Sequence, residues 1–150
     1  MMENQDINNW KLLEVIDEIL IVDEKSQNYI KDVFDEINIP KTSFEDGNRV
    51  KTQINWVKIP TYNKFFFDNE GDEKENEIAL RNSKLSNKEN LIITYGWNEP
   101  AIKISTQKFI DEWEDFIAST HWETIIFSED LELIIEVSRD YFMHSNFLIK

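Results

Sequence analysis

The chain has 150 residues and a formal net charge of -14, from 30 acidic and 16 basic side chains. This balance repels nucleic-acid phosphates and anionic lipid surfaces, so it disfavours both as partners and favours a basic protein. With 41% hydrophobic and 13% aromatic residues the chain is too apolar to be disordered, and the absence of Cys excludes disulfides, thiolate metal sites and Cys nucleophiles.

Length and the N-terminal residues set the expected organisation. A chain of 150 residues suits one domain, which we expect to span residues 1–150. The first residues lack the basic start and apolar run of a signal peptide, and the longest apolar run, residues 19–22, is far too short to cross a bilayer. We therefore expect a cytoplasmic protein.

The acidity is concentrated in two blocks. Residues 1–40 carry ten acids and three bases, residues 41–110 carry ten acids and eleven bases, and residues 111–140 carry ten acids and one base. Two such blocks could form one surface that attracts a basic partner. The alternative is that the charge serves solubility alone.

Two helices are predicted in the first forty residues. The first covers residues 9–20, where apolar side chains recur at helical spacing and Asn9 is a suitable N-cap. The second begins at Ser26 as its cap and ends at Glu36, because Pro40 prevents further helix. Its apolar face consists of Tyr29, Ile30, Val33, Phe34 and Ile37.

The middle of the chain is predicted to hold short strands and a loop. Residues 50–59 are β-prone and end at Pro60, and residues 65–67 form a second short strand candidate. Residues 68–88 are polar and charged, which predicts a loop with one helical turn near residues 78–80.

The C-terminal part is predicted in most detail. Strands are expected at residues 91–95 and 101–104, joined by a turn at residues 96–100. A helix capped by Ser105 or Thr106 should continue to Ala118, because one apolar stripe runs along it. Three further strands are expected at residues 122–127, 131–137 and 141–149.

These elements predict an α+β fold, with N-terminal helices followed by a largely antiparallel sheet and one further helix packed on one face. Residues 131–137 alternate between two faces: one carries Leu131, Leu133, Ile135 and Val137, and the other carries Glu132, Ile134 and Glu136. Such alternation is typical of a sheet with one covered face.

Few residues suggest catalysis or metal binding. The two histidines, His121 and His144, lack metal-ligand spacing to each other and to a carboxylate cluster. An EF-hand loop that began at Asp68 would need Gly at its sixth position and Glu at its twelfth, but Gly71 is fourth and Ala79 is twelfth. The three Gly residues stand alone, so no phosphate-binding loop is present. We expect no catalytic residue, metal or cofactor.

The partner-binding candidates lie on the predicted helix near residues 106–118 and in the preceding turn. Opposite the apolar stripe stand Asp111, Glu114 and Asp115, flanked by Glu112, with no Lys or Arg three or four residues after them. Such a face costs helix stability, which suggests selection for a binding role, and an ordinary solvated acidic face is the alternative that stays open. Trp97 and Glu99 lie in the turn, where a Trp could anchor a contact or pack across its hairpin, whereas Trp56 and Trp113 are expected in the core.

The C-terminal two-fifths of the chain resembles the small acidic immunity proteins of bacterial polymorphic toxin systems. The resemblance covers residues 91–97, the acidic helix, residues 122–127 and the closing residues 145–149. It implies a protein that binds and neutralises a basic partner, such as a nuclease toxin, without catalysis. It carries no family site residues to this chain.

Two other functions remain open on the sequence. The many aromatic residues also suit a small-molecule sensor with a pocket between helix and sheet, and the abundant carboxylates suit a hydrolase. For the binding protein we expect neither nucleic acid nor membrane as partner, and a monomer or a homodimer.

Overall fold

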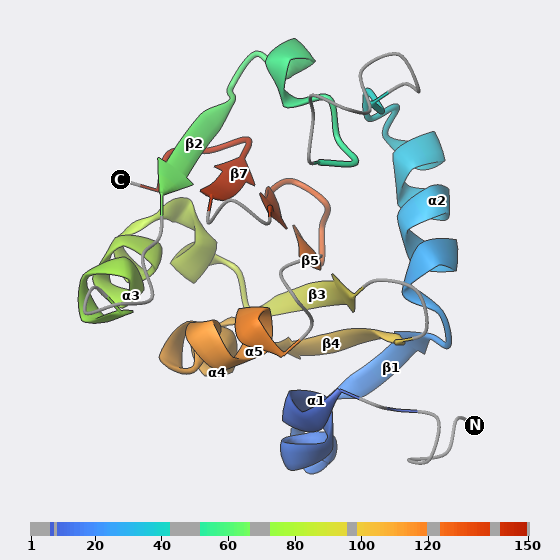
Figure 1. Cartoon of the computed structure of the whole chain (residues 1–150), viewed down its shortest axis with the longest axis vertical. Helices are drawn as coiled ribbons and strands as arrows, with labels where there is room; N and C mark the ends of the chain where they lie inside the picture. Colours follow the sequence, from blue (N-terminus) through green and yellow to red (C-terminus); the bar gives the residue numbers. More distant parts are fainter. Residues whose placement is uncertain are drawn as a thin grey trace.

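The computed structural model describes residues 7, 9–42, 52–66, 73–95, 99–119, 124–138 and 142–149 (Figure 1). Its helices are α1 (Trp10–Glu14), α2 (Ser26–Glu36), α3 (Glu73–Asn82), α4 (Thr106–Asp111) and α5 (Trp113–Ala118), with 3-10 helices η2 (Ile16–Glu18), η3 (Trp56–Lys58) and η4 (Lys84–Asn87). Its strands are β1 (Leu20–Asp23), β2 (Asn63–Phe66), β3 (Asn90–Tyr95), β4 (Ala101–Ser105), β5 (Thr124–Ser128), β6 (Ile134–Val137) and β7 (Phe142–Ser145).

The strands of the described residues form one sheet in the order β1-β4-β3-β5-β6-β7-β2. Every neighbouring pair is antiparallel. Both β4 and β5 pair with β3, so they run parallel to each other, and the connection between them must cross one face of the sheet. Helices α4 and α5 form this crossover. The expected α+β class is confirmed.

The sheet is covered on both faces, which corrects the expectation of a single covered face. One cluster of buried side chains joins α1, α3, α4 and α5 to one face, and a second joins α2, Ile39, Ile54 and Trp56 to the other. In Figure 1, α2 stands apart from α1, α4 and α5, across the sheet. Successive side chains of β6 do point to opposite faces of the sheet, since Ile135 lies in the first cluster and Ile134 in the second. Both faces of the strand are nevertheless buried.

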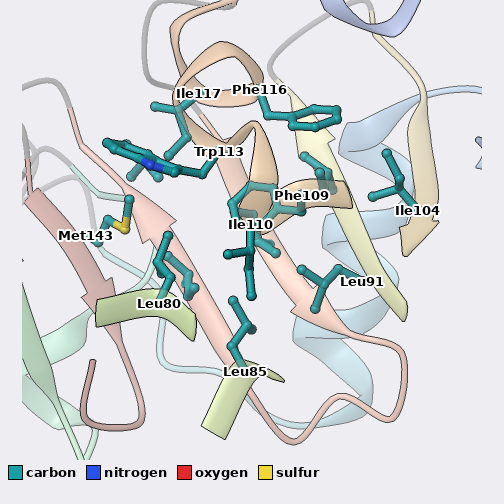
Figure 2. Close-up of a cluster of buried hydrophobic side chains, with 14 of the residues drawn as sticks. Leu80, Leu85, Leu91, Ile104, Phe109, Ile110, Trp113, Phe116, Ile117 and Met143 are labelled. Carbon is teal, nitrogen blue, oxygen red and sulfur yellow. The ribbon is translucent and has the colours of Figure 1, made fainter. Parts of the chain in front are cut away.

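The larger cluster is built on the apolar stripe of the crossover helices (Figure 2). The stripe is buried against β3, α3 and η4, and it includes the expected core residue Trp113; its members are Phe109, Ile110, Trp113, Phe116 and Ile117. Each such side chain contributes about 1.5–3 kcal/mol through burial, which makes this cluster the main support of the helices. Trp56 is buried in the second cluster, as expected.

The first helix is shorter than predicted. Asn9 caps α1 as expected, because its side-chain oxygen accepts hydrogen bonds from the backbone N–H groups of Lys11 and Leu12. The helix ends at Glu14, and Leu20 and Ile21 lie in β1 instead of a helix. Their pairing with Lys103 and Ile102 of β4 overrides the helical spacing.

The second helix has the predicted span but not the predicted cap. Lys25 occupies the N-cap position of α2, and the hydroxyl of Ser26 accepts a hydrogen bond from the backbone N–H of Tyr95, at 2.8 Å. Ser26 therefore joins α2 to β3. At the other end, Asn38 has a φ of 53°, a left-handed conformation that Asn tolerates well, and the helix stops there.

Two predicted elements of the middle region are wrong. Residues 73–82, expected as mostly loop, form the helix α3. The sequence of this helix is mostly polar, and the packing of Ala79 and Leu80 against the core stabilises it. Within residues 52–59, the described part of a predicted strand, Ile54 forms one isolated bridge and residues 56–58 form η3. The strand expected at residues 65–67 is confirmed as β2 in its described part. None of the described helices is long and apolar enough to cross a membrane.

Candidate partner-binding surface

The predicted acidic helix is two helices joined at Glu112. Residue Glu112 has a φ of -130° and a ψ of 31°, outside the helical range, so α4 ends before it and α5 begins after it. Ser105 caps α4, as expected, by accepting a hydrogen bond from the N–H of Lys108. The break turns the carboxylate of Glu112 toward α1.

A buried lysine from α1 meets this carboxylate. The side chain of Lys11 is completely covered, and its ammonium donates a hydrogen bond to Glu112 and another to Glu14, at 3.2 Å. It lies 3.8 Å from a carboxylate oxygen of Asp115 and 5.2 Å from the centre of the Phe116 ring. Burial disfavours the charge, but these hydrogen bonds outweigh it and raise the pKa of Lys11.

The expectation that the acids of this face lack compensating cations is wrong. Lys108 pairs with Glu112 from four residues earlier in the chain, and the hydrogen bonds from Lys108 and Lys11 lower the pKa of Glu112. Asp111 accepts a hydrogen bond from Arg81 of α3, at 2.7 Å. Lys11 and Arg81 come from distant parts of the sequence, so a search along one helix could not find them.

These groups form what we call the acidic helix surface. Five of its carboxylates, with Lys74 and Trp113, line a hollow of about 430 Å³. Ion pairs connect the other members of the surface to these groups. Its carboxylates outnumber its cations by seven to four; the carboxylates are Glu14, Glu18, Glu77, Asp111, Glu112, Glu114 and Asp115, and the cations are Lys11, Lys74, Arg81 and Lys108. Glu14 and Glu18 of the first acidic block therefore meet residues 111–115 of the second here, through Lys11 and Lys108.

Of the two turn residues predicted to bind the partner, only Glu99 is described by the structure, and it is not on this surface. Glu99 is buried just before β4, where its charge adds to the effect of burial in raising the pKa of Tyr95. Trp97 lies outside the described residues, as does His121. Of the predicted partner-binding residues, the structure brings together Asp111, Glu112, Glu114 and Asp115.

An exposed apolar pair that the sequence did not single out lies on α1. Trp10 is 52% exposed and Leu13 is 42% exposed, and they stand three residues apart on one side of the helix. The other side carries Leu12 and Val15 into the core. Reading the helix as a wheel would have placed Trp10 opposite Leu12, which is the signal that could have identified it.

A buried polar cluster lies on the opposite face of the sheet. Glu136 of β6 accepts hydrogen bonds from the backbone N–H groups of Gln53 and Ile54, at 2.7 and 3.1 Å, and from the indole N–H of Trp56, at 3.0 Å. Burial raises the pKa of Glu136 to about 7, against the effect of the three donors. The carboxyl thereby fixes residues 53–56 to the sheet.

His144 continues this cluster from the neighbouring strand. It pairs with Glu136 in the β6–β7 register, and its ring nitrogens lie 2.8 Å from the hydroxyl of Tyr62 and 3.0 Å from that of Ser138. The rings of Trp56 and Tyr62 stack on it. Sequence reasoning missed this arrangement, because Trp56 and Tyr62 are far along the chain from Glu136 and His144. Within the described ranges, no three His, Asp or Glu side chains are placed to hold a metal ion.

Comparison of the chain with models of known protein families and with curated proteins gives no match. The case for a function therefore depends on the acidic helix surface, its exposed apolar neighbours and the buried polar cluster.

Proposed function

We propose that this chain is an immunity-type binding protein that neutralises a basic protein partner, with a nuclease toxin as the class of partner. The observation that carries the proposal is the acidic helix surface, where carboxylates outnumber cations by seven to four and five of the carboxylates line an open hollow. A protein that binds phosphates presents Lys and Arg side chains, and this surface is complementary to them.

The ion pairs inside the surface support a binding role. Lys11 and Lys108 hold Glu112 in place, and Arg81 holds Asp111. Carboxylates that are already fixed lose less conformational freedom when a partner binds, so less of the interaction energy is spent on ordering them. The surplus negative charge remains available to attract the partner over a Debye length of about 8–10 Å.

The exposed apolar pair supplies the other component of an interface. Trp10 follows Asn9, which is tied to Ser119 at the end of α5 by a hydrogen bond of 2.9 Å. Trp is enriched among the residues that dominate binding energy, and here it stands on a helix packed against the acidic helices. An apolar anchor beside a charged surface is the usual composition of a specific interface.

The test uses the purified product of the gene adjacent to the one that encodes this chain. Association rates are measured by surface plasmon resonance at low and moderate salt for the native chain and for Glu114→Gln/Asp115→Asn. We expect association to slow about tenfold as salt rises, and the variant to associate several times more slowly at low salt, because both changes weaken long-range attraction.

A matched control separates local from overall charge. Asp32→Asn/Glu36→Gln removes the same two charges from the exposed side of α2, on the other face of the sheet, and should leave the rate within about twofold of the native one. Equal slowing by both variants, or rates that do not respond to salt, would reject the acidic helix surface as the binding site.

One observation favours the small-molecule sensor as a second candidate. A mainly apolar hollow of about 490 Å³ lies between α3 and the residues after β7, lined by Ile78, Ala79, Leu148 and Ile149 with Glu75 and Asn82. Its size is in the range of ligand pockets. A thermal-shift screen against metabolites, repeated with Ala79→Trp to fill the hollow, would detect a ligand as a rise in melting temperature that the variant loses.

A further inference from the structure

The strand β1 ends the sheet on the side of α1. It pairs with β4, and within the described residues no strand lies along its other edge. Figure 1 shows β1 as the last strand beside β4. An edge strand of this kind offers backbone N–H and C=O groups to any extended segment that approaches it.

The side chains of β1 do not protect this edge. Leu20 is 62% exposed and Val22 is 41% exposed, and they alternate with Ile21, which packs against the core. At the opposite end of the sheet, the edge strand β2 carries the exposed Lys64, a residue that discourages pairing. The protein thus guards one edge of its sheet with a charge. The other edge is short and its register with β4 shifts between Ile21 and Asp23, but it leaves an apolar surface exposed.

Acidic residues flank β1 on both sides. Asp17 and Glu18 precede the strand, Asp23 ends it and Glu24 follows it, and residues 17–24 contain no Lys or Arg. Glu18 pairs with Lys108 of α4, at 3.4 Å. Three of the four acids are exposed; the partial exception is Asp23, which accepts a hydrogen bond from the N–H of Lys25. A second copy of the chain would bring acids against acids at both ends of the pairing, in either strand direction. Self-pairing is therefore disfavoured, and a segment with basic ends is favoured.

We propose that the outer edge of β1 binds an extended segment of a protein partner, which adds a strand to the sheet and carries basic residues on both sides of an apolar centre. The segment would place alternate apolar side chains beside Leu20 and Val22 and its basic residues near the flanking acids. A span of four to five paired residues is about 13–17 Å long. The inference rests on the proposed function, since it deepens the description of the same basic partner.

The test uses a synthetic peptide and the whole chain. The peptide has about nine residues, with alternating Val and Thr in its centre and two Lys at each end, and hydrogen exchange is followed residue by residue. We expect slower exchange in residues 20–23 and little change in β2. Two further peptides carry backbone N-methyl groups, one peptide along one edge of its strand and the other along the opposite edge. The peptide whose methyl groups face β1 cannot form the backbone hydrogen bonds and should bind about tenfold more weakly than the other.

Matched variants locate the site. Leu20→Lys/Val22→Lys should weaken peptide binding about tenfold, whereas Val57→Lys/Ile78→Lys, which adds the same charge at exposed apolar positions elsewhere, should leave it within about twofold. Any of three results would overturn the inference. The two variants could bind the peptide equally, the three peptides could bind the native chain equally, or residues 20–23 could show no protection at millimolar peptide. The inference would also be overturned if the native chain formed a dimer and Leu20→Lys/Val22→Lys abolished it, because the edge would then bind a second copy of the chain.

The two proposals can fail separately. If the adjacent-gene product binds with a steep salt dependence but is unaffected by Leu20→Lys/Val22→Lys, strand addition is wrong and the acidic binding protein stands. If the peptide protects β1 while association with that product is independent of salt, the proposed function fails and the edge remains a strand-binding site for another basic segment.

Discussion

At the scale of single residues, Glu136 has the most unusual environment. Its carboxyl is buried between β6 and residues 53–56, and three N–H groups donate to its two oxygens. Burial favours the protonated form, and the donors favour the ionised form. The net effect raises the pKa of Glu136 to about 7, so the proton is lost near neutral pH in the folded protein and near pH 4.5 in the unfolded chain.

This pKa predicts a loss of stability as pH rises. Because the folded state binds the proton more tightly, the contribution of Glu136 is fully present below pH 4.5 and disappears as pH rises through about 7. Between about pH 5 and pH 8 the free energy of unfolding should fall by about 2–3 kcal/mol more in the native chain than in Glu136→Gln, which cannot ionise. Urea unfolding of both proteins measures the difference, and parallel pH profiles would show that the donors keep the carboxyl ionised throughout.

At the scale of elements, Lys11 joins α1 to α5. Its ammonium is enclosed, whereas the carboxylates of Glu14 and Asp115 are more than half exposed and that of Glu112 is 30% exposed. Removing the lysine therefore leaves partly exposed carboxylates, whereas removing a carboxylate leaves an enclosed ammonium with fewer partners. An exposed carboxylate can be hydrated again, but an enclosed ammonium cannot.

The asymmetry gives a testable order of stabilities. Glu112→Gln leaves the enclosed ammonium with weaker partners and should cost about 1–3 kcal/mol, whereas Lys11→Met replaces the lysine by an apolar side chain of similar length and should cost less than about 1 kcal/mol. The double variant should be more stable than Glu112→Gln alone. Urea denaturation tests the order, and a larger loss for Lys11→Met would mean that the ammonium contributes more than its desolvation costs.

The elements that the sequence predicted are those with a strong local pattern. The apolar face that includes Ile30 and Phe34 predicted α2, and the stripe from Phe109 to Ile117 predicted the crossover helices. The missed features depend on partners far along the chain. β1 exists because β4 pairs with it, and the helices break at Glu112, where the side chain pairs with Lys11 of α1.

The candidate site was predictable in its charge and not in its geometry. Acids at positions 111, 112, 114 and 115 do share a surface, although the helix breaks at Glu112. The rest of the site depends on how α1, α3 and β4 pack. This packing brings Lys11 and Arg81 to the acids, leaves Trp10 exposed and buries Glu99. The buried Glu136 was unforeseen because alternation within β6 suggested an outward carboxylate, and the segment that covers it has no regular pattern.

At the scale of the whole molecule, the net charge of -14 opposes folding through repulsion among the carboxylates. Raising NaCl from about 0.02 M to about 0.5 M shortens the Debye length from roughly 20 Å to roughly 4 Å and screens this repulsion. We expect the melting temperature to rise by a few degrees over this range. Calorimetry in NaCl and in KCl should agree, and a fall in melting temperature would show that the surface ion pairs contribute more than the repulsion costs.

The order of the strands has a consequence for how the protein is made on the ribosome. β1 and β2 are synthesised early, yet β1 pairs with β4 and β2 pairs with β7, at residues 142–145. The crossover helices that cover α1 also emerge late. β1 therefore has no partner strand until β4 has left the exit tunnel, and β2 has none until β7 has left it. During that interval the apolar strand β1 is protected from premature pairing chiefly by the acids on either side of it.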